Sequence, residues 1–279
     1  MGTLYIVGTP LGNLEDITLR AVRVLGRVDL IAAEDTRVSH RLLSHLGLHV
    51  PLTSYHQHNW QAKLPSLLEA LTSSNVALVT DAGMPGISDP GSQLVARAAE
   101  AGFPVEVVPG ASAVTAALAV SGLPGDSFLF IGFLPRRSSE RRAQLESVAS
   151  LPQTLVIFEA PHRLTVTLPE MLAALGNREI SVCRELTKLH QEVFRGRISQ
   201  AIEYFDSPRG EFVLVVAGAD DEGTGPEVGS IDLSEIKRQL QELRESGAKA
   251  KEAVALVAEA SGLPKNQVYG LWLKTRVQA

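Results

Sequence analysis

Short apolar runs alternate with helical patterns through the first half of the chain, and this alternation constrains the fold more than any other feature. Predicted strands are Leu4–Val7, Leu30–Ala33, Val76–Val79 and Val105–Val108, and predicted helices cover 18–26, 39–46, 92–101 and 111–120. Strands that alternate with helices are typical of an α/β domain with a largely parallel sheet.

The second half repeats the alternation and predicts a second α/β domain. The segment Ser121-Gly122-Leu123-Pro124-Gly125 interrupts the first pattern. Strands are then predicted at 128–133, 154–158, 180–183 and 212–217, with helices at 138–147 and 164–175. The acidic, Gly-containing stretch that follows lacks any period, as linkers do. We therefore expect domains at 1–120 and 121–219, a linker at 220–230 and a further unit at 231–279.

The last unit shows helical spacing and little else. Apolar residues recur at Ile236, Leu240 and Leu243 and again at Ala250, Val254 and Val257, and a turn at 261–264 precedes a third helical pattern. Two short helices around such a turn fit a helix-turn-helix. They fit a helical hairpin that packs on the main body equally well.

Composition indicates an ordinary globular protein of the cytoplasm. Of the 279 residues, 45% are hydrophobic and 20% are charged. No apolar run approaches the roughly 18 residues of a membrane helix, and no basic segment precedes the first strand as in a secretory signal. The single cysteine, Cys183, excludes disulfide scaffolding and is interpreted as a buried structural thiol.

The charge pattern neither favours nor excludes nucleic-acid binding. The net charge is −5, whereas nucleic-acid-binding domains are usually basic. However, residues 136–142 carry four arginines against one glutamate, and residues 234–279 hold eight Lys and Arg against five Glu. A solvated helix face explains either cluster as well as phosphate contacts do.

Glycine-rich loops follow three of the predicted strands. In residues 80–91 the glycines permit positive φ, and Asp81 and Asp89 place carboxylates where open α/β sheets bind ligands. The loop at 8–14 matches neither the dinucleotide fingerprint nor the P-loop, and Pro10 lacks the N–H that a pyrophosphate cradle needs. In the loop at 109–113, Gly110 allows close approach of a ligand or close packing of helix on sheet.

These loops form a recognisable set together with five further motifs. The loops read Gly-Thr-Pro-Leu-Gly-Asn-Leu-Glu-Asp-Ile-Thr, Asp-Ala-Gly-Met-Pro-Gly-Ile-Ser-Asp-Pro-Gly and Pro-Gly-Ala-Ser-Ala. The further motifs are Ala-Glu-Asp-Thr-Arg, Ser-Tyr-His-Gln-His-Asn, Gly-Phe-Leu-Pro, Phe-Glu-Ala-Pro-His-Arg and Arg-Glu-Leu-Thr-Lys. The set resembles the tetrapyrrole-methylase superfamily of AdoMet-dependent methyltransferases. Within that superfamily it is similar to the branch that methylates a cytidine ribose of 16S rRNA at the 2′ oxygen. Met84 and Gly86 stand where that family usually has Thr and Leu.

The resemblance implies two α/β domains of the tetrapyrrole-methylase type, with AdoMet in the cleft between them, and a C-terminal helical unit. The substrate implied is cytidine 1402 in the decoding centre of 16S rRNA, within the small ribosomal subunit. A homodimer with no metal and no membrane attachment is also implied. The residues expected to bind AdoMet are Leu11, Asp81, Gly83, Met84, Ser112, Ala113, Phe158, Glu159 and Pro161.

Transfer of a methyl group to a ribose hydroxyl needs a group that takes the proton, because the hydroxyl is barely ionised at neutral pH. Candidates for this catalytic base are Asp35, His56, Asp89 and Glu185. Candidates for contacts with RNA phosphates are Arg37, Arg136, Arg137, Arg163, Arg184 and Lys188. A structural salt bridge explains any one of these charged residues equally well. His56 and His58 lack a third ligand, which argues against a metal site.

Three other functions are weighed against this one. A small-molecule methylase of the tetrapyrrole branch would need neither the helical tail nor the arginine cluster. The donor-binding loops count against an RNA-binding protein without catalytic activity. Pro10 disfavours a nicotinamide-dependent oxidoreductase.

Overall fold

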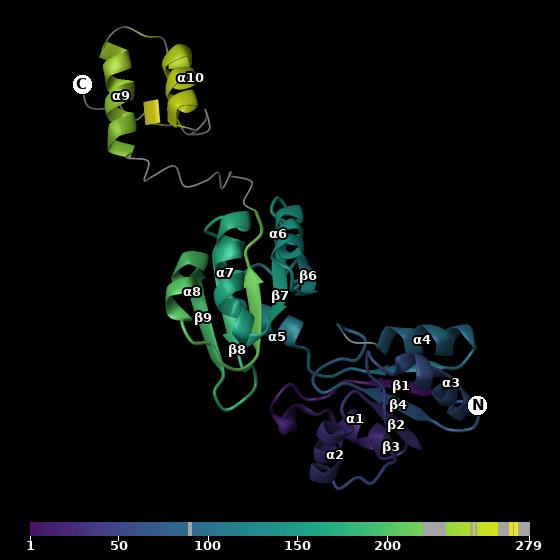
Figure 1. Ribbon diagram of the computed structural model, residues 1–279. Helices are drawn as coiled ribbons and strands as arrows, with labels where there is room; N and C mark the ends of the chain where they lie inside the picture. Colours follow the sequence, from purple (N-terminus) through teal and green to yellow (C-terminus); the bar gives the residue numbers. More distant parts are fainter. Residues whose placement is uncertain are drawn as a thin grey trace. The chain divides into compact units, whose positions relative to one another are not determined.

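The computed structural model describes residues 1–88, 91–219, 233–245, 248, 250–261, 268–269 and 271–272. Contacts within the chain divide it into two units, Met1–Glu222 and Gly223–Ala279 (Figure 1). The first unit holds two five-stranded sheets, and the second unit holds helices.

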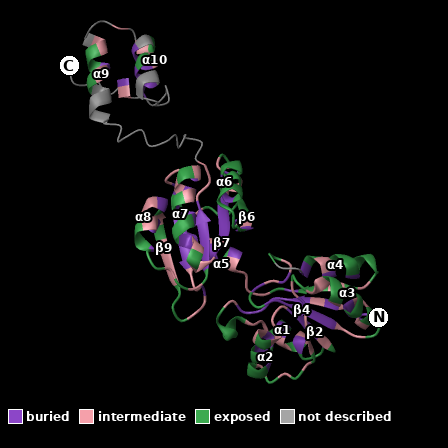
Figure 2. Ribbon diagram, viewed as in Figure 1, coloured by how far each residue is buried: buried purple, intermediate pink, exposed green. Residues whose placement is uncertain are grey.

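The first sheet is parallel throughout and has the strand order β3-β2-β4-β1-β5. Its strands are β1 (Leu4–Val7), β2 (Leu30–Ala33), β3 (Leu52–Ser54), β4 (Val76–Val79) and β5 (Val105–Val108). Leu4 and Ile6 of β1 pack with α3 (Trp60–Ala70) and α4 (Gly91–Glu100). Val7 faces the opposite side and packs with α1 (Leu19–Leu25) and α2 (Thr36–His45). Both faces are covered, which explains why these strands read as continuous apolar runs (Figure 2).

The second sheet is mixed and has the order β6-β7-β10-β8-β9. β6 (Phe128–Phe133) pairs in parallel with β7 (Thr154–Glu159), whereas β10 (Phe212–Val216), β8 (Glu179–Arg184) and β9 (Glu192–Arg197) pair antiparallel. Leu214 of β10 faces a core shared with α6 (Ser138–Ser147), α7 (Pro161–Leu175) and α8 (Ile198–Tyr204). Val213 and Val215 face the opposite side.

Helix α5 (Ala113–Ser121) joins the two sheets. It follows the last strand of the first sheet, yet its Val114 and Ala117 pack against Val156, Cys183 and Val213 of the second sheet. The loop before α5 therefore runs from the carboxyl end of β5 directly onto the other sheet.

The second unit has its own core. Helices α9 (Leu233–Glu245) and α10 (Ala250–Ser261) bury Leu240, Val254 and Val257 together with Trp272, and the Arg244 guanidinium lies 5.2 Å from the centre of the Trp272 ring. The predicted helical spacing is accounted for by this packing. The turn at 262–264 and the side chain of Ile236 lie outside the described residues.

The expected fold class, two α/β domains followed by a helical unit, is confirmed. The structure adds elements that the sequence did not predict, among them α3 and β9. Pro65 lies inside α3 and breaks the expected helical pattern, and β9 carries a glutamate and two arginines on a sheet edge. No helix of the described part of the chain is long and apolar enough to cross a membrane.

Candidate active site

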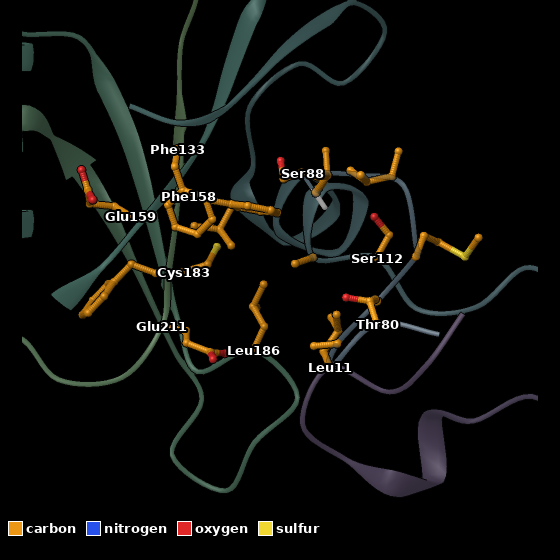
Figure 3. Close-up of a pocket in the computed structure, with 18 of the residues that line it drawn as sticks. Leu11, Thr80, Ser88, Ser112, Phe133, Phe158, Glu159, Cys183, Leu186 and Glu211 are labelled. Carbon is orange, nitrogen blue, oxygen red and sulfur yellow. The ribbon is translucent and has the colours of Figure 1, made fainter. Parts of the chain in front are cut away.

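A pocket of about 350 Å³ lies where the loops at the carboxyl ends of the first sheet meet the second sheet (Figure 3). Leu11, Thr80 and Ser112 lie on one side of it, and Phe158, Cys183 and Leu186 lie on the other. Pockets that hold small molecules span roughly 300–1,000 Å³, so the volume suits such a ligand. The remaining lining residues are Glu34, Ala82, Gly83, Met84, Ile87, Ser88, Ala113, Val114, Phe133, Glu159, Ala160, Pro161, Glu211, Phe212 and Val213.

Glycines let the three loops of the first sheet approach one another. A Cβ on Gly8 would lie 2.7 Å from Cα of Gly110, so the loops after β1 and β5 touch backbone to backbone. The N–H of Thr9 donates to the carbonyl of Gly83 at 2.9 Å, and the N–H of Gly83 donates back at 3.2 Å. Gly83 has a φ of 84°, which favours glycine. These backbone contacts hold together the three loops that contribute Leu11, Gly83 and Ser112 to the pocket.

The loop after β8 in the second sheet contacts the loop after β1 in the first sheet. The Thr187 hydroxyl accepts a hydrogen bond from the N–H of Asn13 at 3.2 Å. Lys188 Nζ binds Glu185 Oε1 at 3.0 Å and Glu211 Oε2 at 2.9 Å. Burial raises the pKa of Glu185, but hydrogen bonds from the Glu211 N–H and from Lys188 outweigh it and hold that pKa below its ordinary value. Glu185 and Lys188 thus form part of a structural ion-pair network.

Eight of the nine residues expected to bind AdoMet line this pocket: Leu11, Gly83, Met84, Ser112, Ala113, Phe158, Glu159 and Pro161. Asp81 is not among the lining residues. Its Oδ1 accepts a hydrogen bond from the N–H of Asp35 at 3.0 Å. Burial and the nearby charge of Glu34 raise the pKa of Asp81.

Glu159 lines the pocket, but its carboxylate binds groups at the start of α7. Oε1 accepts from the N–H of Ala160 at 2.8 Å and lies 3.4 Å from Nε of Arg163, and Oε2 accepts from the Thr167 hydroxyl at 2.6 Å. The side chain is fully buried. These contacts place the start of α7 against the pocket wall.

Glu34 lines the pocket and is a residue that was not predicted to belong to the site. Its Oε2 accepts hydrogen bonds from the Thr80 hydroxyl and from the N–H of Asp81. The sequence contained a clue to this position, because Glu34 directly follows β2 within the motif Ala-Glu-Asp-Thr-Arg. The neighbouring Asp35 instead caps α2 and forms an ion pair with Arg37, which lowers the pKa of Asp35 to about 2.

The remaining candidates for the catalytic base are His56 and Asp89. His56 is outside the pocket lining, and its Nδ1 accepts a hydrogen bond from the N–H of His58 at 3.2 Å. Asp89 lies outside the described residues. Within the described ranges no group of three or more His, Cys, Asp or Glu is arranged to hold a metal.

Most of the cations expected to meet RNA have protein partners. Arg163 donates to the carbonyls of Leu134 and Pro135 at 2.8 and 2.9 Å, and Arg184 donates to the carbonyl of Arg209 at 2.7 Å and to Glu192 at 3.0 Å. Arg137 pairs with Glu140 at 3.2 Å on the helix surface. Arg136 is exposed, and its side chain forms no hydrogen bond or ion pair within the described part of the chain.

The chemistry of the pocket fits AdoMet. Phe158 supplies apolar surface for a flat ring, while Thr80, Ser88 and Ser112 supply hydroxyls for polar groups. Cys183 is buried in the wall, and burial raises the pKa of its thiol, so it is a neutral lining group at neutral pH.

Comparison with known proteins places the chain in a family. The model of the Tetrapyrrole (Corrin/Porphyrin) Methylases matches residues 3–202, and that of the RsmI C-terminal HTH domain matches residues 231–276. A protein of Halalkalibacterium halodurans named Ribosomal RNA small subunit methyltransferase I is 45% identical over 274 residues, 97% of this chain and 94% of that protein. A Thermotoga maritima protein of the same name is 48% identical over 223 residues, 79% of this chain and 100% of that protein.

A solved structure supports the fold. The crystal structure of diphthine synthase superposes with a TM-score of 0.65 at 17% identity and covers 78% of this chain and 90% of its own. At that identity the likeness concerns the fold alone. The matches over nearly the whole length carry the assignment, and the chain belongs to the ribosomal RNA small subunit methyltransferase I family of the tetrapyrrole methylases.

Proposed function

We propose that this protein transfers a methyl group from AdoMet to the 2′-hydroxyl of a cytidine ribose in 16S rRNA, at position 1402 of the decoding centre. It acts in the cytoplasm as a homodimer, on the small ribosomal subunit. The observation that carries the proposal is the pocket at the carboxyl ends of the first sheet, which is lined by eight of the residues expected to bind AdoMet. Relatives named Ribosomal RNA small subunit methyltransferase I, which match nearly the whole chain, support it.

The residues that would hold AdoMet come from both sheets. Leu11, Gly83 and Met84 would contact it from the first sheet, Ser112 and Ala113 from the start of α5, and Phe158 and Pro161 from the second sheet. When bound, AdoMet supplies the methyl group, whose bond to sulfur breaks as the bond to the ribose oxygen forms and a neutral thioether leaves. The protein positions the reacting groups and excludes water from the pocket.

An assay with competing acceptors tests the reaction. Purified protein and radiolabelled AdoMet are incubated with small ribosomal subunits, with naked 16S rRNA and with uroporphyrinogen III. We expect label in the RNA, recovered as 2′-O-methylcytidine after digestion. Label in the tetrapyrrole and none in RNA would establish the small-molecule alternative, and label in neither would refute both.

We propose that the C-terminal unit helps to bring the substrate to the active site and takes no part in AdoMet binding. The unit has its own core, and its match is to a helix-turn-helix domain. The Thermotoga maritima relative aligns over its whole length with 223 residues of this chain, so a shorter protein carries the same name. The unit is therefore expected to increase efficiency rather than to perform the chemistry.

A chain that ends at Gly229 should bind AdoMet with unchanged affinity and methylate small subunits at least about tenfold more slowly at limiting RNA concentration, since each lost phosphate contact weakens binding. Calorimetry measures the first quantity and initial rates measure the second. Full activity of the truncated chain at all RNA concentrations would contradict a role in substrate delivery.

A further inference from the structure

A second cavity, of about 760 Å³, adjoins the candidate AdoMet pocket. Four residues line both: Glu34, Ser88, Phe133 and Ala160. The rest of its wall is more polar than that of the AdoMet pocket and comes from the loop after β3, the starts of α3, α4 and α7, and the loop after β6. These residues are Gln57, Trp60, Gln93, Leu134, Pro135, Arg136, His162 and Arg163.

Two aromatic side chains give this cavity flat apolar surfaces. Phe133 is 57% exposed and meets Phe158 edge to face, with ring centres 5.5 Å apart. Trp60 at the start of α3 lies in the opposite domain. A base taken out of an RNA stack is commonly bound on such rings, because every base has a π face.

Cationic and amide groups surround these rings. Arg136 and His162 are exposed, and neither side chain has a hydrogen-bond or ion-pair partner among the residues that the structure describes. The backbone beneath Arg136 is fixed, since Arg141 donates to the carbonyls of Pro135 and Arg136, both at 3.1 Å. Held by a rigid backbone, Arg136 is available to a phosphate. The amides of Gln57 and Gln93 can pair with the edge of a base.

Glu34 lies at the junction of the two cavities, and the described residues donate hydrogen bonds to only one of its two carboxylate oxygens. Oε2 accepts from Thr80 and Asp81, which fixes the carboxylate in place. Oε1 forms no hydrogen bond with any described residue. By contrast, both oxygens of Asp35 bind Arg37, and Glu185 Oε1 binds Lys188 and the Glu211 N–H. Glu34 is therefore the carboxylate best placed to receive a proton between the two cavities.

We propose that the second cavity binds the target nucleotide of the RNA in an unstacked conformation and that Glu34 is the catalytic base; this inference rests on the proposed function. The base lies against Phe133, and a flanking phosphate binds Arg136 and His162. The ribose 2′-hydroxyl points toward Glu34. Its O–H bond breaks and the proton moves to Oε1, while an electron pair of the oxygen forms a bond to the methyl carbon of AdoMet and the carbon–sulfur bond breaks with its electrons left on sulfur. Glu34 then releases the proton to water.

Photocross-linking of the wild-type protein tests the location without relying on activity. A 16S-derived RNA with 5-iodocytidine at the target position is irradiated with the full-length protein, and mass spectrometry locates the attachment. We expect the cross-link at Phe133 or Trp60. A cross-link confined to residues outside the second cavity would overturn the placement of the nucleotide.

The Glu34→Gln variant tests the proton transfer. The glutamine carbonyl can still accept from Thr80 and Asp81, so AdoMet and RNA affinities should stay within about twofold, whereas the single-turnover methylation rate should fall by about 10²- to 10⁴-fold. An unchanged rate would overturn the assignment of Glu34. So would a loss of rate fully explained by weaker binding of AdoMet or RNA.

The Arg136→Ala variant tests the phosphate contact, with Arg97→Ala as its matched control. Arg97 is exposed on α4, pairs with Glu100 and lines neither cavity. Arg136→Ala should reduce the slope of log affinity for RNA against log salt by about one, and Arg97→Ala should leave it unchanged. Equal slopes for the two variants would overturn the contact.

If the wild-type protein methylates no cytidine, the proposed function fails. If it methylates a cytidine but the cross-link lies outside the second cavity, only this inference fails.

Discussion

Replacing Gly8 with alanine is expected to weaken AdoMet binding by about 10- to 100-fold. The added Cβ would lie 2.7 Å from Cα and 2.8 Å from N of Gly110, and backbone atoms cannot move aside as a flexible side chain can. Forcing an extra carbon into such a contact costs about 1–3 kcal/mol, and each 1.4 kcal/mol is a factor of ten in affinity. Because the loops that hold both glycines line the candidate AdoMet pocket, we expect the strain to be relieved by movement of these loops apart, which would widen the pocket.

Calorimetric titration with AdoMet measures the effect, and Gly125→Ala is the control. A Cβ on Gly125 would lie 3.5 Å from Leu118 Cδ2, an ordinary contact, and Gly125 does not line the pocket. The control should bind AdoMet as the wild type does. Wild-type affinity of a folded Gly8→Ala protein would show that contact between the loops after β1 and β5 does not shape the AdoMet site.

Replacing Arg141 with methionine is expected to lower the free energy of unfolding by about 3 kcal/mol. Arg141 pairs with Glu170 and also donates to the carbonyls of Pro135 and Arg136. Its side chain is 6% exposed and that of Glu170 is 16% exposed. Loss of one partner from a buried pair leaves the other charge uncompensated, which typically costs about 3–5 kcal/mol; the partial exposure of Glu170 favours the lower value. Urea denaturation measures the change.

The same pair predicts how stability depends on pH. Hydrogen bonds from Arg141 hold the pKa of Glu170 below its ordinary value of 4.5. A carboxyl group with a lowered pKa stabilises the fold above its unfolded pKa, and this contribution disappears as the pH falls through the folded value. The difference in stability between wild type and Arg141→Met should therefore shrink in acid.

Arg142→Met provides the control for Arg141→Met, because Arg142 is exposed on the same helix. It should change the stability by no more than about 0.5 kcal/mol. If the two variants were equally stable, the buried pair would not hold α6 to α7 in the way that the structure indicates.

The sequence revealed those features that leave a local pattern. β4 and β10 were predicted because they are buried on both faces and therefore consist almost entirely of apolar residues. The turn in the loop after β4 was predicted because glycines permit positive φ, and Gly83 and Gly86 adopt it. A motif of several consecutive residues can be recognised from the sequence alone, without knowledge of which elements pack against it.

The remaining features depend on tertiary contacts. Nothing local distinguishes Arg141, which is buried, from Arg142, which is exposed, because burial is set by α7 and its Glu170. Glu34 and Asp35 are adjacent carboxylates, and only the packing of β2 beside β4 places Glu34 against Thr80. Lys188 has a local partner in Glu185, three residues before it, but its second partner, Glu211, is brought beside it only by the pairing of β8 with β10.

Nucleoside mass spectrometry of 16S rRNA tests the central claim most directly. RNA is compared from cells that lack this protein, from cells that regain the wild-type chain and from cells that regain Gly8→Ala. We expect 2′-O-methylation at cytidine 1402 to be absent in the first, complete in the second and strongly reduced in the third. Full 2′-O-methylation of that cytidine in cells without the protein would contradict the proposed function.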